Sequence, residues 1–542
     1  MRKSVKQQLA LRVLSTAALM AMVSSIATAA FADTYDLNKG SVTVETKADG
    51  ITYVTQKDDK QADGYARNEN DDILHDYQDK TGVTITSGGE KTSNTITVDT
   101  AKDQTTDVTL QDVHIEVNTT RAKSGAIEIK GDGDTNLELN GDNTVLVENE
   151  WSEEHAAIEK ADKYGTGTLT IKDDVNDDGS KKTGTEADTT GKLLAGGYHN
   201  SAAIGGGSNT YNREYSLADT SNITITGGEI TAIGGNDGCA GIGGGYNGTG
   251  KNIRIEGNAH VTAVAGDGAA IGGGIGSGNS VTITDDAVVD AYSAFAAAIG
   301  NGDQVGRPND PTTITISGNA TVHAENSQRG GCAIGNGRDG SLSDLTVNIE
   351  KNANVTAISS YDCPAIGTPL CIGATTTTIN ITGGTVNAIN SFGSDNPEYS
   401  SQYDGTRDTS PAIGTTIDSD RSGTCNVNIN SSTGDTVVNA YIYGKGSGTA
   451  IGSRYKGQNV PADSASYKAD GSSHFGERNS AIVNCYNNGT VAKEKLNLPS
   501  TKDPLALNYN KYSHTITGGT LTKVVHNTLT YVVYQLRLFH SS

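Results

Sequence analysis

The stretch Ile223-Thr-Ile-Thr-Gly-Gly-Glu-Ile-Thr-Ala232 decides the fold, because the chain repeats its pattern at a nearly constant interval. Further copies follow about every thirty residues, and they occupy 253–263, 281–291, 314–324, 347–357 and 379–388. Self-similarity at such a period is typical of solenoids, in which each repeat stacks only on its neighbours. We therefore expect one long repeat domain rather than the several globular domains that 542 residues would otherwise suggest.

Each copy contains two apolar and polar alternations joined by a tight turn. In the first alternation, Ile223 and Ile225 are each followed by Thr, and this period of two is typical of a half-buried strand. The second residue of the turn is Gly, Asn or Asp in every copy, at Gly228, Asn258, Asp286, Asn319, Asn352 and Gly384. Because these residue types adopt positive φ most easily, we expect a left-handed backbone at each of these positions.

A third short run follows a loop of variable length. It is centred on an Ile that Ala or Gly precedes and Gly follows, at Ile204, Ile242, Ile271, Ile299, Ile334, Ile366, Ile413 and Ile451. Small residues beside each Ile let neighbouring repeats pack closely. Three short strands per turn, with turns ~4.8 Å apart, predict an all-β fold, a right-handed parallel β-helix filled with Ile, Val and Ala.

The N-terminal residues have the pattern of an export signal. Arg2, Lys3, Lys6 and Arg12 precede the apolar run 13–30, and a small-residue pattern ends at Ala32. This arrangement is typical of a cleavable secretory signal peptide over residues 1–32, so we expect an extracellular protein that is secreted or held at the cell surface. No later segment is apolar and long enough to span a bilayer.

The rest of the chain divides where the repeat weakens. Residues 33–80 are polar and irregular and are expected to form an N-terminal cap. The parallel β-helix is expected over 81–490, and 491–542 form a C-terminal tail or terminal cap.

The formal net charge of −22 argues against two classes of partner. A strongly acidic surface repels nucleic acid and anionic lipid, so neither is an expected ligand. Solubility outside the cell explains the charge, and calcium coordination or repulsion of anionic sugars are the alternatives.

Several segments at the start of the repeat array carry a family resemblance, namely 82–89, 94–98, 108–113, 126–129 and 136–141, together with the later Ile-Gly-Gly-Gly runs. Over about 34 to 455 the chain resembles the β-helical carbohydrate-binding-domain proteins of Gram-positive bacterial surfaces. The resemblance implies polysaccharide binding without catalysis, sometimes with bound calcium. A surface adhesin that binds a protein partner is the nearest alternative.

A polysaccharide lyase or glycoside hydrolase is the enzymatic alternative, because parallel β-helices also carry such activities. It needs paired carboxylates, or calcium with a basic residue. The short patterns Gly-His-Gly, Arg-Ile-Lys and Arg-x-Pro-x-x-Arg are absent, so we expect no catalytic residues. His260 and His323 lie in outward positions two turns apart, about 10 Å, and are expected as solvated surface histidines rather than an acid–base pair.

Tyrosine supplies 22 of the 28 aromatic residues and therefore most of the rings that could stack on sugars. The candidates for carbohydrate binding fall in loops between repeats, at Tyr198, Tyr211, Tyr215, Tyr246, Tyr361, Tyr399, Tyr403 and Tyr455. An exposed ring suits the apolar face of a pyranose, and nearby polar groups bind its hydroxyls. Packing of these loops against the helix is the alternative role.

Residues 174–179 match the first half of a calcium loop, with Asp174, Asn176 and Asp178 as candidate ligands before Gly179. Position twelve is Thr185 rather than Glu, and a solvated acidic loop is the alternative. Calcium is the one cofactor that the sequence suggests.

Six cysteines occur at Cys239, Cys332, Cys363, Cys371, Cys425 and Cys485. We expect buried thiols, with a Cys363–Cys371 loop disulfide as the alternative. Their spacing contains no Cys-x-x-Cys pair and does not fit zinc.

Overall fold

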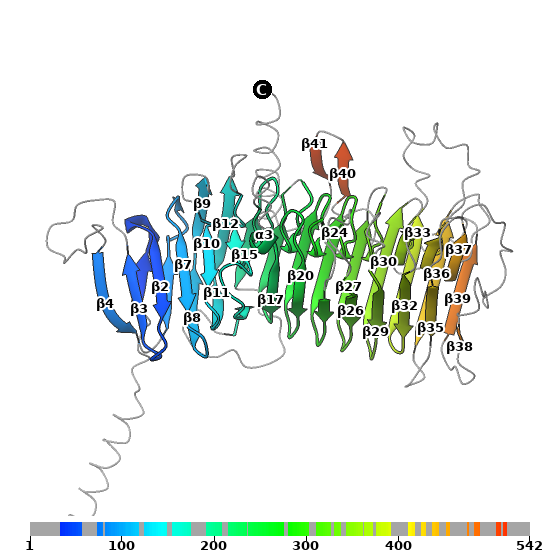
Figure 1. The fold of residues 1–542 in the computed structure, drawn as a ribbon, viewed down its shortest axis with the longest axis horizontal. Coiled ribbons are helices and arrows are strands. Elements are labelled where there is room, and N and C mark those ends of the chain that lie inside the picture. The colour runs from blue at the N-terminus through cyan, green and yellow to red at the C-terminus, as the bar shows by residue number, and fades with distance from the viewer. Residues whose placement is uncertain are drawn as a thin grey trace, which may run out of the picture.

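The structure is a computed structural model. It describes residues 33–56, 73–79, 82–118, 124–148, 154–174, 191–208, 215–235, 237–275, 280–302, 310–326, 330–337, 343–360, 363–371, 375–391, 410–417, 424–429, 436–443, 451–455, 474–475, 482–487, 506–510 and 513–517. The predicted signal peptide, 1–32, lies outside them. Three long sheets run side by side along an elongated molecule (Figure 1).

The first sheet collects the first alternation of every repeat and has 13 strands, all paired in parallel with their neighbours. Its strands are β1 (Asp33–Asp36), β5 (Val83–Thr86), β8 (Thr105–Gln111), β11 (Asp134–Asn140), β14 (Leu169–Lys172), β17 (Thr220–Ile225), β20 (Gly250–Ile255), β23 (Ser280–Ile283), β26 (Thr312–Ile316), β29 (Leu345–Ile349), β32 (Thr376–Ile381), β35 (Thr424–Ile429) and β38 (His474–Phe475).

The second sheet collects the second alternation and has 12 parallel strands. They are β6 (Lys91–Thr92), β9 (His114–Asn118), β12 (Asp142–Glu148), β15 (Lys192–Gly196), β18 (Glu229–Ile233), β21 (His260–Ala265), β24 (Val288–Ser293), β27 (Thr321–Asn326), β30 (Asn354–Ser360), β33 (Thr385–Ser391), β36 (Val437–Tyr443) and β39 (Ile482–Asn487).

The third sheet collects the Ile-Gly runs and has 14 strands. They are β4 (Ile73–Asp79), β3 (Thr52–Gln56), β2 (Val42–Thr46), β7 (Ile96–Thr100), β10 (Ile127–Lys130), β13 (Ile158–Glu159), β16 (Ile204–Gly205), β19 (Ile242–Gly243), β22 (Ile271–Gly272), β25 (Ile299–Gly300), β28 (Ile334–Gly335), β31 (Ile366–Cys371), β34 (Ile413–Ile417) and β37 (Ile451–Tyr455). Within it, the pairs β2–β3 and β3–β4 are antiparallel and the other pairs are parallel.

The remaining described elements are short. They are the 3-10 helix η1 (Leu37–Lys39), the helix α3 (Tyr215–Ala218), and the strands β40 (Ala506–Asn510) and β41 (Ser513–Thr517), which form a separate antiparallel pair. β1 and β2 pair in parallel with β5 and β7, so the first strands of the array lie inside the segment 33–80 that was expected as a cap.

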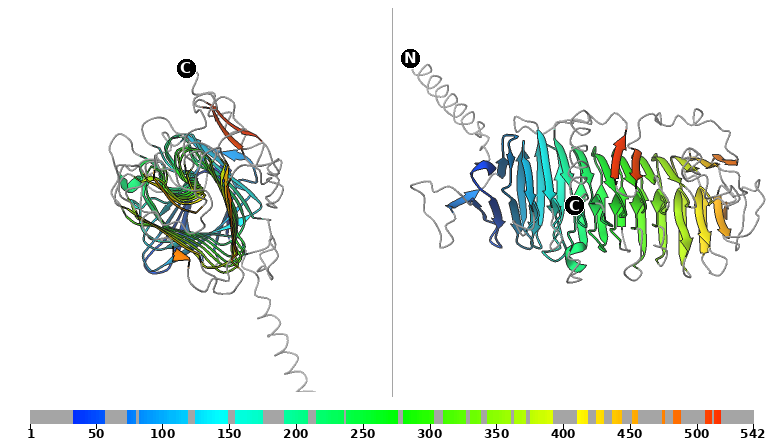
Figure 2. Two further views of the ribbon diagram at one scale, coloured as in Figure 1. Left: turned by 90° about the vertical axis from the view of Figure 1, so that its right-hand side faces the viewer. Right: turned by 90° about the horizontal axis from the view of Figure 1, so that it is seen from above.

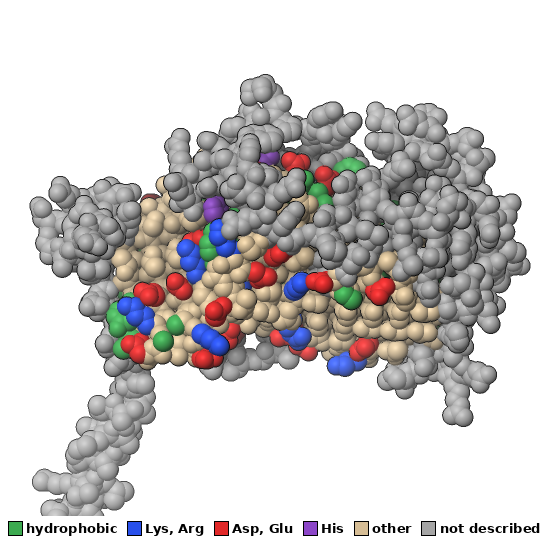
Figure 3. Space-filling view, in the orientation of Figure 1, with side chains coloured by type: hydrophobic (Ala, Val, Ile, Leu, Met, Phe, Trp, Pro, Cys, Tyr) green, Lys and Arg blue, Asp and Glu red, His purple; other side chains and the backbone are tan. Residues whose placement is uncertain are grey.

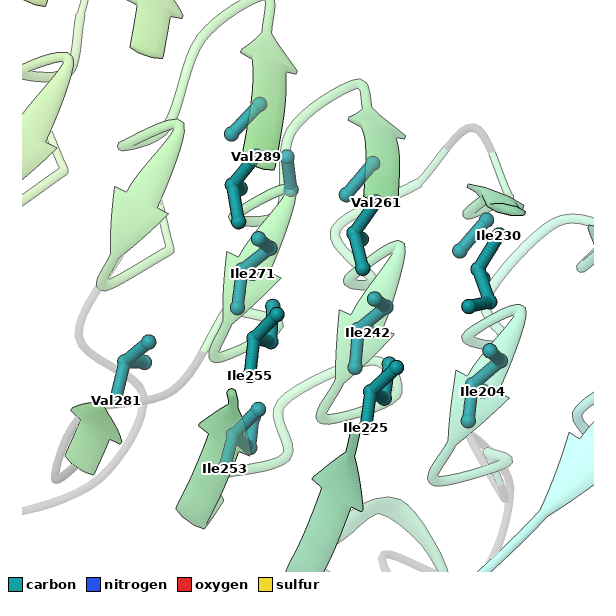
Figure 4. Close-up of a cluster of buried hydrophobic side chains, with 14 of the residues drawn as sticks. Ile204, Ile225, Ile230, Ile242, Ile253, Ile255, Val261, Ile271, Val281 and Val289 are labelled. Atoms are coloured by element: carbon teal, nitrogen blue, oxygen red, sulfur yellow. The ribbon is translucent and has the colours of Figure 1, made fainter. Parts of the chain in front are cut away.

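The residue register confirms the parallel β-helix that the repeat predicts. Ile223, Ile253 and Val281 are direct partners in the first sheet, and the Ile of each Ile-Gly run is the partner of the next from Ile204 to Ile451. Seen along its length, the three sheets surround this apolar interior (Figure 2). The Ile and Val side chains stack in columns and are buried (Figure 4).

Two features require glycine in the Ile-Gly run: the backbone conformation at this position, and the lack of room for a Cβ atom. Gly272 has φ 137°, a conformation that residues with a Cβ rarely adopt. A Cβ at Gly272 would also overlap the carbonyl oxygen of Gly300 in the next turn. The glycines from Gly205 to Gly414 all share both features, so this column sets how closely successive turns approach.

The turn between the first and second sheets differs from the sequence-based expectation at four of the six positions. Gly228 and Gly384 have positive φ as predicted. At Asn258, Asp286, Asn319 and Asn352 the prediction is wrong, because the left-handed residue is the preceding one, at Gly257, Asp285, Gly318 and Lys351. These four turns are one residue longer, and the extra residue lets a buried Ala follow, at Ala259, Ala287, Ala320 and Ala353.

A ladder of side-chain hydrogen bonds accounts for Asn and Asp in those turns. Asn319 Nδ2 donates to Asp286 Oδ1 over 2.9 Å, and Asn352 Nδ2 donates to Asn319 Oδ1 over 3.0 Å. The residue type is therefore selected by contact with the neighbouring turn rather than by its own φ.

The thiols of Cys239, Cys332, Cys363 and Cys425 are buried and form no disulfides, as expected. The alternative Cys363–Cys371 disulfide is wrong. That bridge would require the thiol of Cys363, which forms no disulfide. The side chains of Cys371 and Cys485 lie outside the described residues. In the described part of the chain, no helix has the length and apolar character needed to cross a membrane.

Candidate functional site

Several titratable side chains lie on the outer face of the second sheet, in β21, β24 and β27. On the side of the molecule shown in Figure 3, charged side chains are scattered over a mostly uncharged described surface rather than joined in one patch. In β21, β24 and β27 the inward positions are the buried Val261, Val289 and Val322. Alternation places the side chains between them on the outer face.

Two columns of side chains define this face, which we call the second-sheet face. Register pairing aligns a polar column across successive turns, Thr262, Asp290, His323, Thr356, Asn387 and Asn439. It aligns beside it a largely apolar column, Val264, Tyr292, Glu325, Ile358, Ile389 and Tyr441. Val264, Tyr292, Ile389 and Tyr441 are buried but stand apart from the continuous interior core, as residues on the outer face should.

The centre of the second-sheet face is a contact group formed by β24 and β27. Asp290 is the direct partner of His323, and Tyr292 is the partner of Glu325. His323 Nε2 lies 3.4 Å from Glu325 Oε2, and the rings of Tyr292 and His323 are 5.6 Å apart between centroids. His323 and Glu325 keep 15% and 20% of their side-chain surface exposed, whereas Tyr292 is buried.

Burial and neighbouring charges shift the pKa values of Asp290 and Tyr292 in this group. Burial raises the pKa of Asp290, and the neighbouring His323 and His260 oppose that rise. Burial also raises the pKa of Tyr292, and the charges of Asp290 and Glu325 raise it further. The Tyr292 hydroxyl therefore remains a protonated donor at every physiological pH. The Nδ1 atom of His323 is buried, and it has no hydrogen-bond partner among the residues that the structure describes.

The expectation that His260 and His323 are solvated surface histidines is wrong for His323, which keeps only 15% of its side-chain surface exposed. His260 belongs to the outermost column, as the partner of Val288, whereas His323 belongs to the polar column and packs against Tyr292 and Glu325. A sequence signal was available: when the repeats are aligned, Val289-Asp-Ala-Tyr292 superposes on Val322-His-Ala-Glu325. Neighbouring copies thus place carboxylate, imidazole and phenol side by side.

A second group of titratable residues interrupts the glycine column of the third sheet. Glu128 is the direct partner of Glu159, which in turn is the partner of Gly205. Glu159 Oε2 accepts from the backbone N–H of Ala156 over 3.0 Å and lies 2.7 Å from His155 Nδ1. Both carboxyl groups are buried. Sequence reasoning missed this pair because neither residue follows the Ile-Gly pattern, and that departure was its signal.

Burial raises the pKa values of two carboxyl groups in this region, Glu128 and Glu154. Burial raises the pKa of Glu128, an effect that the hydrogen bond from Lys130 opposes and the charge of Glu159 reinforces. Burial likewise raises the pKa of Glu154 against opposing interactions with Asn200 and His199. Because these carboxyl groups are enclosed, their first effect is on pH-dependent stability.

The eight tyrosines expected in loops are only partly described. Tyr198 is not an exposed platform, since it retains 6% of its surface, belongs to the interior core and packs edge-on against His199. Tyr246 is half-buried. Tyr211, Tyr361, Tyr399 and Tyr403 lie outside the described residues. Tyr215 and Tyr455 fall within α3 and β37, but their side chains lie outside them.

The expected calcium ligands are described only at Asp174. Its carboxylate is exposed and lies 3.1 Å from Lys172 Nζ. Asn176 and Asp178 lie outside the described residues. Among the residues that the structure does describe, no three His, Cys, Asp or Glu side chains are arranged to hold a metal ion.

Comparison of the chain with protein families, with curated proteins and with solved structures found no match. The geometry of the second-sheet face therefore carries the functional argument.

Proposed function

We propose that the protein is a secreted or cell-surface, non-catalytic carbohydrate-binding β-helix, and that a glycan chain lies along the second-sheet face. The observation that supports this best is the polar column, which repeats once per turn along the outer face of the second sheet. The family resemblance carried by residues 82–141 points to the same class of ligand.

A polysaccharide suits such a surface for a physical reason. It is a linear polymer whose rings each present an apolar face and a set of hydroxyl groups. Asn387 and Asn439 are half-buried and supply hydrogen-bond donors and acceptors. Turns spaced ~4.8 Å apart repeat these groups along the axis, so one chain gains many weak contacts in register.

The scaffold also reduces the entropic cost of binding. Asn439 Nδ2 donates to Asn387 Oδ1 over 2.9 Å, which holds two members of the polar column in place before any ligand arrives. Side chains ordered in advance lose less freedom on association, and this improves the affinity of a shallow surface.

One observation favours a second candidate, a glycoside hydrolase. The pKa of Asp290 is raised by burial, as a general acid requires, and Glu325 lies one turn away. A protein-binding adhesin is the other alternative, and it predicts binding that survives removal of the sugar-facing groups.

A glycan array with the exported chain tests these three functions. We expect polysaccharide binding that Asn387→Ala and Asn439→Ala each weaken at least fivefold. Thr282→Ala, an outward position on β23 in the first sheet, is the matched control and should bind like the parent. Binding that all three variants retain would contradict the proposed surface. Release of new reducing ends, abolished by Asp290→Asn, would instead identify a hydrolase.

Calcium remains a separate proposal at Asp174, Asn176 and Asp178. A bound ion would have to displace Lys172 from Asp174. We expect calcium to raise the melting temperature relative to a chelator and Asp174→Asn to remove part of that increase. An identical melting temperature in both conditions would exclude the site.

A further inference from the structure

A row of asparagine side chains, which we call the first-sheet ladder, lies on the outer face of the first sheet. Asn348, Asn380 and Asn428 are direct register partners in β29, β32 and β35. Asn380 Nδ2 donates to Asn348 Oδ1 over 2.9 Å, and Asn428 Nδ2 donates to Asn380 Oδ1 over 2.8 Å. The three side chains are half-buried and alternate with the buried inward residues of their strands, so they face outward.

The amides of the first-sheet ladder keep hydrogen-bonding capacity towards solvent. A side-chain amide has two N–H donors and an oxygen with two lone pairs, and the contacts between turns use one of each at Asn380. A sugar hydroxyl both donates and accepts, so it can use the remaining N–H and the remaining lone pair. The amides recur once per turn, ~4.8 Å apart, which is close to the advance of one sugar unit along an extended polysaccharide.

The strands that carry the first-sheet ladder contain no charged and no aromatic residue. The outward column beside the ladder, Thr346, Thr378 and Asn426, is also half-buried and uncharged. Asp344 and Glu350 lie just beyond the two ends of β29, so they flank the ladder without interrupting it. A face of hydroxyl and amide groups suits a neutral, hydroxyl-rich ligand, because it offers no opposite charge to an ionic one.

A protein partner fits this face poorly. Three strands at ~4.8 Å spacing and ~3.3 Å per residue present on the order of 250 Å². A stable protein interface covers roughly 800 Å² on each partner and draws most of its binding energy from aromatic and Arg anchors. A linear polysaccharide gains its contacts one sugar at a time, so it is the occupant that this face favours.

The turns that carry the first-sheet ladder also carry the polar column of the second-sheet face. β32, with Asn380, leads into β33, with Asn387, and β35 precedes β36, with Asn439, in the next turn. The buried Ile381 and Val386 point from the two sheets into the shared core. Because the sheets surround this core, their outer faces point in different directions (Figure 2). One extended chain therefore cannot lie along both faces.

We propose that the protein is bivalent: one neutral polysaccharide chain binds along the first-sheet ladder while another lies along the second-sheet face, so that a single protein molecule bridges the two. This inference rests on the proposed glycan-binding function and adds a second site, an uncharged ligand class and a cross-linking role. Two sites acting on one polymer network give an avidity that exceeds either affinity by roughly 10²–10⁴-fold, so losing either face weakens binding to the polymer.

The number of short ligands bound per chain tests bivalency. The full exported chain is titrated by calorimetry with hexamers of three neutral polysaccharides, a β-1,4-glucan, a β-1,4-mannan and a β-1,3-glucan, and with a galacturonate hexamer. We expect at least one neutral hexamer to bind with a stoichiometry of two per chain. The corresponding long polymer should form large cross-linked assemblies with the protein, and light scattering should be greatest at an intermediate ratio of protein to polymer.

Variants of each face locate the two sites. Asn380→Ala and Asn428→Ala should each lower the stoichiometry to one hexamer, abolish cross-linking and weaken binding to the polymer at least tenfold. Asn387→Ala should do the same from the second-sheet face. Asn319→Ala removes a laddered amide from an exposed turn away from both faces, so this matched control should still bind two hexamers. Asn380→Ala and Asn428→Ala are independent, so loss of folding in one leaves the other as the test.

A parent protein that binds one hexamer per chain would overturn bivalency while leaving glycan binding in place. Two sites that Asn380→Ala and Asn428→Ala both retain would also overturn it, because the second chain would then bind elsewhere. Binding of the galacturonate hexamer but of none of the neutral ones would overturn the uncharged ligand class. Absence of binding to every hexamer and polymer would overturn the inference together with the proposed function.

Discussion

Glu128 and Glu159 are direct register partners in neighbouring turns of the third sheet, at the position that Gly205 and the later Ile-Gly runs fill with glycine. Two buried carboxyl groups in adjacent turns repel one another when both are ionised. The pair therefore couples the stability of the N-terminal turns to pH.

Glu128→Gln should stabilise the protein at neutral pH. Burial raises the pKa of Glu128, so the folded protein binds this proton more tightly than the unfolded chain does. The resulting stabilisation is complete below the unfolded-state pKa of about 4.3 and is lost as pH rises through the folded-state pKa. Gln mimics the protonated form at every pH, so we expect a gain on the order of 1 kcal/mol at pH 7 that disappears in acid.

Urea unfolding at pH 4 and pH 7 measures this effect. Glu45→Gln, at an exposed position of β2, is the control and should have no pH-dependent effect. A Glu128→Gln protein that is less stable than the parent at pH 7 would show that the ion pair with Lys130 outweighs the burial of the charge.

Gly272→Ala should disrupt the stacking of turns. The substitution combines a φ of 137° with overlap between the new Cβ and the carbonyl oxygen of Gly300. We expect a loss of more than about 3 kcal/mol in the free energy of unfolding, or failure to secrete folded protein. Gly88 also has positive φ, but no atom lies within 4 Å of the Cβ that an alanine would add there, so Gly88→Ala should cost only about 1 kcal/mol. Similar losses for both would mean that backbone strain alone, without steric overlap, sets the cost.

Asn326→Ala should destabilise the corner between the second and third sheets. Its Nδ2 atom donates to the carbonyl oxygens of Ala294 and Ala296 over 3.2 and 2.7 Å, in a buried environment. Removing the amide leaves both carbonyls buried without that donor, and we expect a loss of about 2 kcal/mol. Asn348, which takes part in the half-buried ladder on the first sheet, is the control, and Asn348→Ala should cost well under half as much. Thermal unfolding of the two variants side by side makes the comparison.

The sequence predicts the strands well because their determinants are local and repeated. The Ile and Val positions of the six copies become direct register partners, and no long-range information is needed to see this. Features that depend on contact between turns were missed. Tyr198 lies in a Gly-rich loop that looks exposed, yet it is buried and belongs to the interior core. The grouping of Asp290, Tyr292, His323 and Glu325 likewise exists only when copies thirty residues apart are laid side by side.

The turn residues give the clearest case, since Asn352 was expected to be left-handed and Lys351 is. Lys351→Gly should stabilise the protein by about 1 kcal/mol, because glycine adopts a φ of 58° without the penalty that a Cβ brings. Asn352→Gly should destabilise it instead, since its Nδ2 atom donates to Asn319 Oδ1 over 3.0 Å and its own backbone gains nothing. Chemical unfolding of both variants measures the two changes in stability. Stabilisation by Asn352→Gly together with destabilisation by Lys351→Gly would instead support a left-handed backbone at Asn352, as its residue type predicts.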